Sequence, residues 1–209
     1  MISIFVSNCL GRIEQNRFET YLQILNPEEQ RKIKKYKKWD DAQLTLLGRL
    51  LLMRGLSSFG YKHTEFQLEF TASNKPFIQN GPHFNISHSG QFVVCAISEH
   101  HDVGIDIERI APINIQELKD QWSNVEWQTL SASKDPIRLF YNYWTKKESV
   151  VKADGRGLGI PLREVDVTSN ITALHNRQWF LTEVLINPDY VCHVASQIKD
   201  SVQVIPVSF

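Results

Sequence analysis

Two carboxylates alternate with aliphatic residues near the middle of the chain. Residues 103–108 read V-G-I-D-I-E, so a strand here would place Asp106 and Glu108 on one face and the aliphatic side chains on the other. Carboxylates about 7 Å apart repel each other unless a cation or water lies between them, and Mg²⁺ accepts one or two carboxylates together with phosphate oxygens. Gly104 would permit close backbone approach. A half-exposed strand with two solvated acids fits the same pattern.

A second group of charged side chains shares one predicted helix face. Its members follow helical i, i+3, i+4, i+7, i+8 spacing: Trp144, Lys147, Glu148, Val151 and Lys152. Trp144 and Val151 would bury this face, and buried charges are costly without partners. A cleft that holds metal and phosphate would supply partners and would tune Glu148 as a general base. An exposed helix with a Glu148–Lys152 pair has the same spacing.

Three further segments carry groups that can bind phosphate. Residues 31–38 contain six basic side chains, which fit a solvated face, a polyphosphate contact or docking of an acidic partner protein. Lys75 stands on a rigid turn between an asparagine and a proline. Residues 85–90, N-I-S-H-S-G, gather Ser87 and His88 at a strand end, where they form either a phosphate site or a simple turn.

The elements that must position these groups alternate between helices and strands. Asn26-Pro27 begins one helix, and a second runs from about residue 40 to a glycine at 55 or 60. Two similar α+β halves are expected, residues 1–101 and 102–209, with a faint sequence echo between 92–98 and 190–196. The other predicted helices are 115–132 and 136–153; the predicted strands are 1–6, 66–70, 84–87, 92–98, 103–108, 164–168, 179–185, 190–196 and 202–207.

Bulk composition narrows the function class. Lys+Arg and Asp+Glu both total 23, and this balance argues against a protein that binds long stretches of nucleic acid. The longest strongly apolar run, residues 50–53, is too short to span a membrane, and the N-terminal apolar segment lacks the basic lead of a signal peptide. Three widely spaced cysteines give no zinc site and no disulfide framework. A cytoplasmic monomer is expected.

Four motifs, in this order and spacing, make the chain resemble the Sfp-type 4′-phosphopantetheinyl transferases over about residues 26–160. They are N-K-P at 74–76, F-N-I-S-H-S at 84–89, V-G-I-D-I-E at 103–108 and W-x-x-K-E-S-x-x-K at 144–152. The resemblance implies a pseudo-twofold pair of α+β halves with coenzyme A in the cleft between them. It also implies an enzyme of the holo-[acyl-carrier-protein] synthase type.

The resemblance further implies a role for each matching residue. A magnesium ion, or manganese, would be bound by Asp106, Glu108 and Glu126. Glu148 would be the base for the incoming serine hydroxyl of an apo carrier protein, and Lys152 would steady the diphosphate as the serine attacks the β-phosphorus and 3′,5′-ADP leaves. The carrier would serve fatty-acid, polyketide or peptide synthesis. Contacts to coenzyme A are expected from Lys32, Lys75, Pro76, Ser87 and His88.

Two departures and two rival functions remain at this point. Leu44 stands where the family usually has a basic residue, and Glu29 where a lysine can occur, so part of the phosphate contact set is in doubt. A protein that only binds coenzyme A or carrier protein would have lost a metal acid or the Glu148/Lys152 pair, and both are present. A phosphodiesterase that removes such arms would have a denser His/Asp cluster than this sequence shows.

Overall fold

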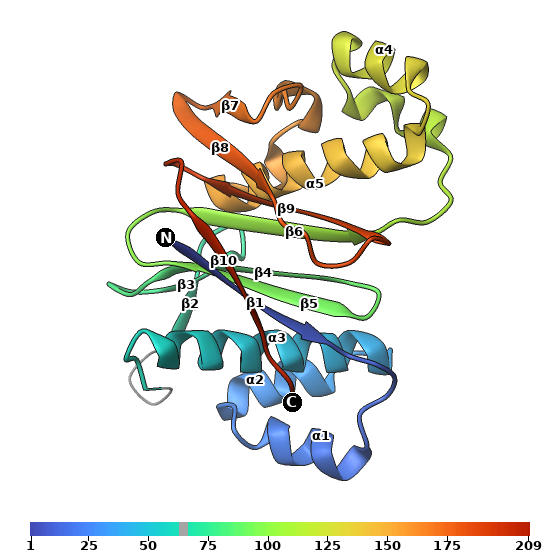
Figure 1. The fold of residues 1–209 in the computed structure, drawn as a ribbon. Helices are drawn as coiled ribbons and strands as arrows, with labels where there is room; N and C mark the ends of the chain where they lie inside the picture. The colour runs from blue at the N-terminus through green and yellow to red at the C-terminus, as the bar shows by residue number, and fades with distance from the viewer. Residues whose placement is uncertain (63–66) are drawn as a thin grey trace.

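The computed structural model describes residues 1–62 and 67–209. Two four-stranded sheets lie in the middle of the molecule, with helices covering the outer face of each (Figure 1). The strand orders are β10-β1-β5-β4 and β6-β9-β8-β7, and a separate hairpin pairs β2 with β3. The α+β class predicted from the sequence is confirmed.

The first half contains most of one sheet and the helices below it in Figure 1. Asn26 caps α2 by accepting hydrogen bonds from the backbone N–H groups of Glu28 and Glu29, as predicted. The predicted strand 66–70 is observed from Leu68, and Phe66 lies outside the described residues. The elements are β1 (Ile2–Asn8), α1 (Gln15–Leu22), α2 (Pro27–Lys34), α3 (Trp39–Ser58), β2 (Leu68–Phe70), β3 (Pro76–Ile78), β4 (His83–Ser89) and β5 (Phe92–Ser98).

The second half departs from the prediction in two places. The predicted helix 115–132 is interrupted, because Trp122 is extended and Ser123 caps a new helix. The predicted strand 164–168 is wrong: this segment bonds to the side chains of Lys147 and Glu126 instead of a neighbouring strand. The elements are β6 (Val103–Arg109), the 3₁₀ helix η1 (Ile115–Gln121), α4 (Asn124–Ala132), α5 (Pro136–Asp154), η2 (Gly157–Gly159), η3 (Leu162–Glu164), β7 (Ile171–Leu174), β8 (Arg177–Glu183), β9 (Tyr190–Ser196) and β10 (Val202–Pro206).

The last strand crosses back to the first half. β10 pairs in parallel with β1, with Ile4 opposite Val204. Residues 202–206 therefore belong to the first sheet, which corrects the expectation that residues 102–209 form the second half alone.

The two sheets face each other across an apolar layer. Aliphatic side chains of β1 and β5 meet those of β6 and β9 there, while α3 packs on the other face of the first sheet and α5 on the other face of the second. β5 lies next to the edge strand β4 in the first sheet, and β9 lies next to the edge strand β6 in the second. These are the two segments with similar sequences, and all seven residues of each are buried. Among the described residues, no helix has the length and apolar character needed to cross a membrane.

Candidate active site

The strand β6 presents its two carboxylates to the helix α5. Val103, Ile105 and Ile107 are fully buried in the layer between the sheets, so Asp106 and Glu108 project to the opposite face. The predicted alternation is therefore confirmed.

Gly104 lets α5 lie directly on this strand. A Cβ atom at this position would stand 2.1 Å from the backbone oxygen of Ser149 and 2.3 Å from the nitrogen of Ala153. Only a residue without a side chain permits such a close helix–strand contact. The contact brings Glu148 and Lys152 of α5 above the carboxylates of β6.

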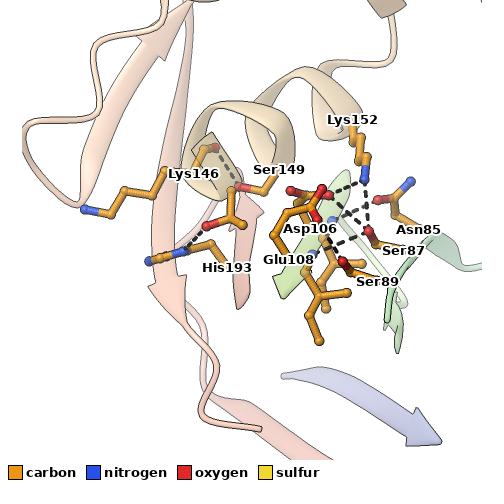
Figure 2. Close-up of polar contacts among 12 residues, drawn as sticks. Asn85, Ser87, Ser89, Asp106, Glu108, Lys146, Ser149, Lys152 and His193 are labelled. Atoms are coloured by element: carbon orange, nitrogen blue, oxygen red, sulfur yellow. Dashed lines mark hydrogen bonds and ion pairs between the residues drawn. The ribbon is translucent and has the colours of Figure 1, made fainter. Parts of the chain in front are cut away.

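Asp106 is the buried centre of this group (Figure 2). Its Oδ1 accepts hydrogen bonds from Lys152 Nζ at 2.5 Å and from Ser87 Oγ at 3.0 Å. Burial raises the pKa of Asp106, and the positive charge of Lys152 acts in the opposite direction. Its second oxygen, Oδ2, is buried and has no hydrogen-bond partner among the described residues. Such buried acceptors are uncommon, and this oxygen is free to bind a water molecule or a cation.

Two more carboxylates add negative charge beside Asp106. Burial raises the pKa of Glu108 and of Glu148, and the charge of Asp106 raises both further. One lysine, Lys152, faces these three acids. A surplus of buried and half-buried negative charge is stabilised by an additional cation or by bound protons. The donor set therefore fits a hard divalent cation with oxygen ligands.

Glu126 does not join this group. It is fully buried on α4, where its Oε2 lies 2.8 Å from Lys147 Nζ and its Oε1 accepts from the backbone N–H of Val167 at 3.1 Å. It also completes a capping box with Ser123. Within residues 1–62 and 67–209, no three His, Cys, Asp or Glu side chains form a ready metal cluster. The expected trio of Asp106, Glu108 and Glu126 is thus not assembled, because Lys147 and the 162–167 segment hold Glu126 elsewhere.

Four of the five residues expected to contact coenzyme A lie in two places: Ser87 and His88 on β4, and Lys75 and Pro76 near the end of α5. Ser87 is buried and bonded to Asp106. His88 lies at the surface, and partial burial of its ring, followed by the charge of Lys152, lowers its pKa. Lys75 donates to the backbone oxygen of Ala153 at 2.9 Å, near the end of α5. With Pro76, the first residue of β3, it lines a cavity of ≈ 270 Å³.

The fifth residue, Lys32, lies on the wall of a cavity of ≈ 900 Å³ between α2, α3 and β2. Arg49 also lines it, with its Nε 3.2 Å from Glu29 Oε1. Arg49 is a cation that the sequence analysis missed, and it offsets the charge of Glu29. Leu44 is buried in the core of the first half, so a basic side chain could not replace it without disturbing that core.

Comparison with known proteins agrees with the motifs. A family model described as 4′-phosphopantetheinyl transferase, N-terminal, matches residues 12–100, and one described as 4′-phosphopantetheinyl transferase superfamily matches residues 102–200. The chain is 35% identical over 170 residues to 4′-phosphopantetheinyl transferase Sfp of Bacillus subtilis, covering 78% of this chain and 74% of that protein. The chain belongs to the 4′-phosphopantetheinyl transferase family.

Two further relatives extend the match along the chain. The transferase gsp of Aneurinibacillus migulanus is 34% identical over 175 residues, covering 82% of this chain and 73% of that protein. The transferase ffp of Bacillus subtilis is 30% identical over 210 residues, covering 94% and 92%. This 4′-phosphopantetheinyl transferase is therefore an enzyme that transfers the 4′-phosphopantetheine group of coenzyme A to carrier proteins, as the motifs predicted.

Proposed function

We propose that the transfer takes place at the junction of β4, β6 and α5, with Asp106 and Glu108 as ligands of Mg²⁺ and Glu148 as the general base. The observation that carries this proposal is the buried Asp106, whose Oδ1 is held by Lys152 while its Oδ2 has no hydrogen-bond partner in residues 1–62 and 67–209. Magnesium takes one or two carboxylates and completes its shell with water and phosphate oxygens, so Glu126 is not needed. Bound there, Mg²⁺ or Mn²⁺ would neutralise charge on the diphosphate of coenzyme A.

The chain's own side chains then account for proton transfer and charge. Glu148 accepts the proton of the carrier serine as the serine oxygen bonds to the β-phosphorus. The bond from that phosphorus to the bridging oxygen breaks, and 3′,5′-ADP leaves with the electron pair. Burial and Asp106 raise the pKa of Glu148, which makes it a stronger base than an exposed glutamate. Lys152, partly exposed, steadies the negative charge on the diphosphate.

Coenzyme A is proposed to lie between the halves, with its phosphates near Lys152, Ser87 and His88. Lys32 and Arg49, on the wall of the larger cavity, are proposed to contact the 3′-phosphate. Lys75 and Pro76 border the smaller cavity at the end of α5.

A transfer assay tests the proposal. The protein is incubated with coenzyme A, Mg²⁺ and a panel of apo carrier proteins from fatty-acid, polyketide and peptide synthesis, and each carrier is weighed by mass spectrometry. We expect a phosphopantetheine increment that needs Mg²⁺ and that Asp106→Ala abolishes. Carriers with the acceptor serine replaced by alanine are the control. Undiminished transfer by folded Asp106→Ala would contradict the assignment. Sedimentation analysis tests the expected monomer.

A further inference from the structure

The edge strands β4 and β6 belong to different sheets, and side chains join them instead of backbone pairs. Asn85 Oδ1 accepts from the N–H of Ile105 at 2.8 Å. The next two bonds run from the N–H of Ile107 to Ser87 Oγ at 3.4 Å and from the N–H of Arg109 to Ser89 Oγ at 3.0 Å. Figure 2 shows the three β4 side chains beside β6. We call Asn85, Ser87 and Ser89 the side-chain ladder.

Two of the three ladder residues also bond a carboxylate of the site. Ser87 donates to Asp106 Oδ1 at 3.0 Å, and Ser89 donates to Glu108 Oε2 at 2.8 Å. A serine hydroxyl has one proton, and here its oxygen also accepts from a backbone N–H, so that proton is directed at the carboxylate. Asn85 accepts from the N–H of Ile105, and the residue before Ile105 is Gly104. Because glycine has no carboxylate, Asn85 has no such group to bond.

The two carboxylates differ in how they are restrained. Asp106 is held by Ser87 and also by Lys152. Among the described residues, Ser89 is the one hydrogen-bond donor to Glu108. Partners of this kind fix the orientation of metal ligands, and their loss typically lowers metal affinity.

We propose that Ser89 is a positioning residue that orients the Glu108 carboxylate toward the metal, in addition to joining the two halves. The inference rests on the proposed metal role of Glu108. It assigns to Ser89 a contribution to metal binding that a purely structural ladder residue would not have. Asn85 is the matched control, since it makes the same kind of bond to β6 without touching a carboxylate.

The test measures Mn²⁺ binding in the presence of coenzyme A by electron paramagnetic resonance, the KM for Mg²⁺ and kcat in the transfer assay, and the melting temperature. Ser89→Ala should weaken Mn²⁺ binding about 10- to 100-fold and raise the KM for Mg²⁺. Asn85→Ala should lower the melting temperature and leave the Kd for Mn²⁺ unchanged. Ser89→Thr, which keeps the hydroxyl, should retain near wild-type affinity for Mn²⁺. Ser89→Val, which has the shape of the threonine variant without its hydroxyl, should not.

The Thr/Val pair isolates the hydroxyl if Ser89→Ala does not fold. Equal Mn²⁺ affinity in Ser89→Thr and Ser89→Val would overturn the inference. An equal loss of Mn²⁺ affinity in Ser89→Ala and Asn85→Ala would overturn it as well. A wild-type enzyme that transfers without any divalent cation would instead overturn the proposed metal site, and the inference with it. The two failures are therefore distinguishable.

Discussion

At the scale of single residues, the site is defined by three neighbouring carboxylates, of which Asp106 is buried and Glu108 and Glu148 are half-buried. Asp106, Glu108 and Glu148 each have a raised pKa, in every case chiefly because of burial. Lys152 compensates part of this charge through Asp106 Oδ1. The arrangement is costly in the absence of a ligand, and strained electrostatics of this kind are typical of functional sites.

Glu148→Gln removes the proposed proton acceptor while keeping the shape of the side chain. We predict that kcat falls roughly 10²–10⁴-fold while coenzyme A and Mn²⁺ still bind. The wild-type rate should decline as the pH drops through the pKa of Glu148, and the variant should lack this decline. Steady-state kinetics across pH provide the measurement. A variant with normal kcat but weakened ligand binding would show that Glu148 only binds.

His193 gives a separate, structural pH effect. It is buried on β9, with its Nδ1 2.8 Å from Thr145 Oγ1, and burial followed by the charge of Lys146 lowers its pKa to about 3. Between its unfolded pKa of about 6.5 and its folded pKa, only the unfolded chain binds the proton. The free energy of unfolding should therefore fall by about 1.4 kcal/mol per pH unit as the pH drops through this window. Urea titrations of wild type and His193→Gln check this, and equal slopes in the two proteins would contradict it.

At the scale of elements, adjacent residues of α5 have different roles, one in the site and one in the core of the second half. Glu148 and Lys152 face β6, whereas Lys147 turns to Glu126 and to the backbone oxygens of Leu162 and Val165. The spacing of charges along the helix predicted that they need partners. It did not predict that Lys147 and Glu148 take different partners, because that depends on where the 162–167 segment packs.

Features that depend on local sequence patterns were predictable, whereas contacts between distant segments were not. The alternation of residues 103–108 and the cap at Asn26 are local patterns, and both were confirmed. Short-range patterns do not encode contacts between β4 and β6, which lie about twenty residues apart along the chain. The contribution of Ser89 therefore becomes visible only in the structure, although its polar alternation with Asn85 and Ser87 was a signal in the sequence.

Variants of Glu126 test whether this residue is a structural partner of Lys147 or a metal ligand. Its removal leaves the buried Lys147 without its counter-charge, so Glu126→Ala should lower the free energy of unfolding by about 3–5 kcal/mol. The double variant Glu126→Gln/Lys147→Met, which removes both charges, should recover much of this loss. Denaturant unfolding gives the stability, and Mn²⁺ affinity should stay unchanged in the double variant. Loss of Mn²⁺ binding in a fully folded double variant would restore Glu126 as a metal ligand.

At the scale of the whole molecule, the site depends on both halves. β6 supplies Asp106 and Glu108, α5 supplies Glu148 and Lys152, and β4 supplies the serines that bond the two β6 carboxylates. Three connections keep the halves in register: the apolar layer between the sheets, the side-chain ladder, and β10, which returns to pair with β1. Relative movement of the halves would separate Ser89 from Glu108 and so disturb the site.

These connections predict that the halves unfold together. If each half were an independent domain, separation would expose the apolar layer built from β1, β5, β6 and β9, and would detach β10 from its sheet. Exposure of that much apolar surface is unfavourable, so one cooperative transition is expected. Labelling with 5-fluorotryptophan gives a fluorine resonance for Trp39 in the first half and for Trp179 in the second. In a urea titration both should lose native intensity at the same midpoint, and Ser89→Ala should shift the two midpoints equally. Two separated midpoints in the wild-type protein would contradict this prediction and would show that the junction contributes little to stability.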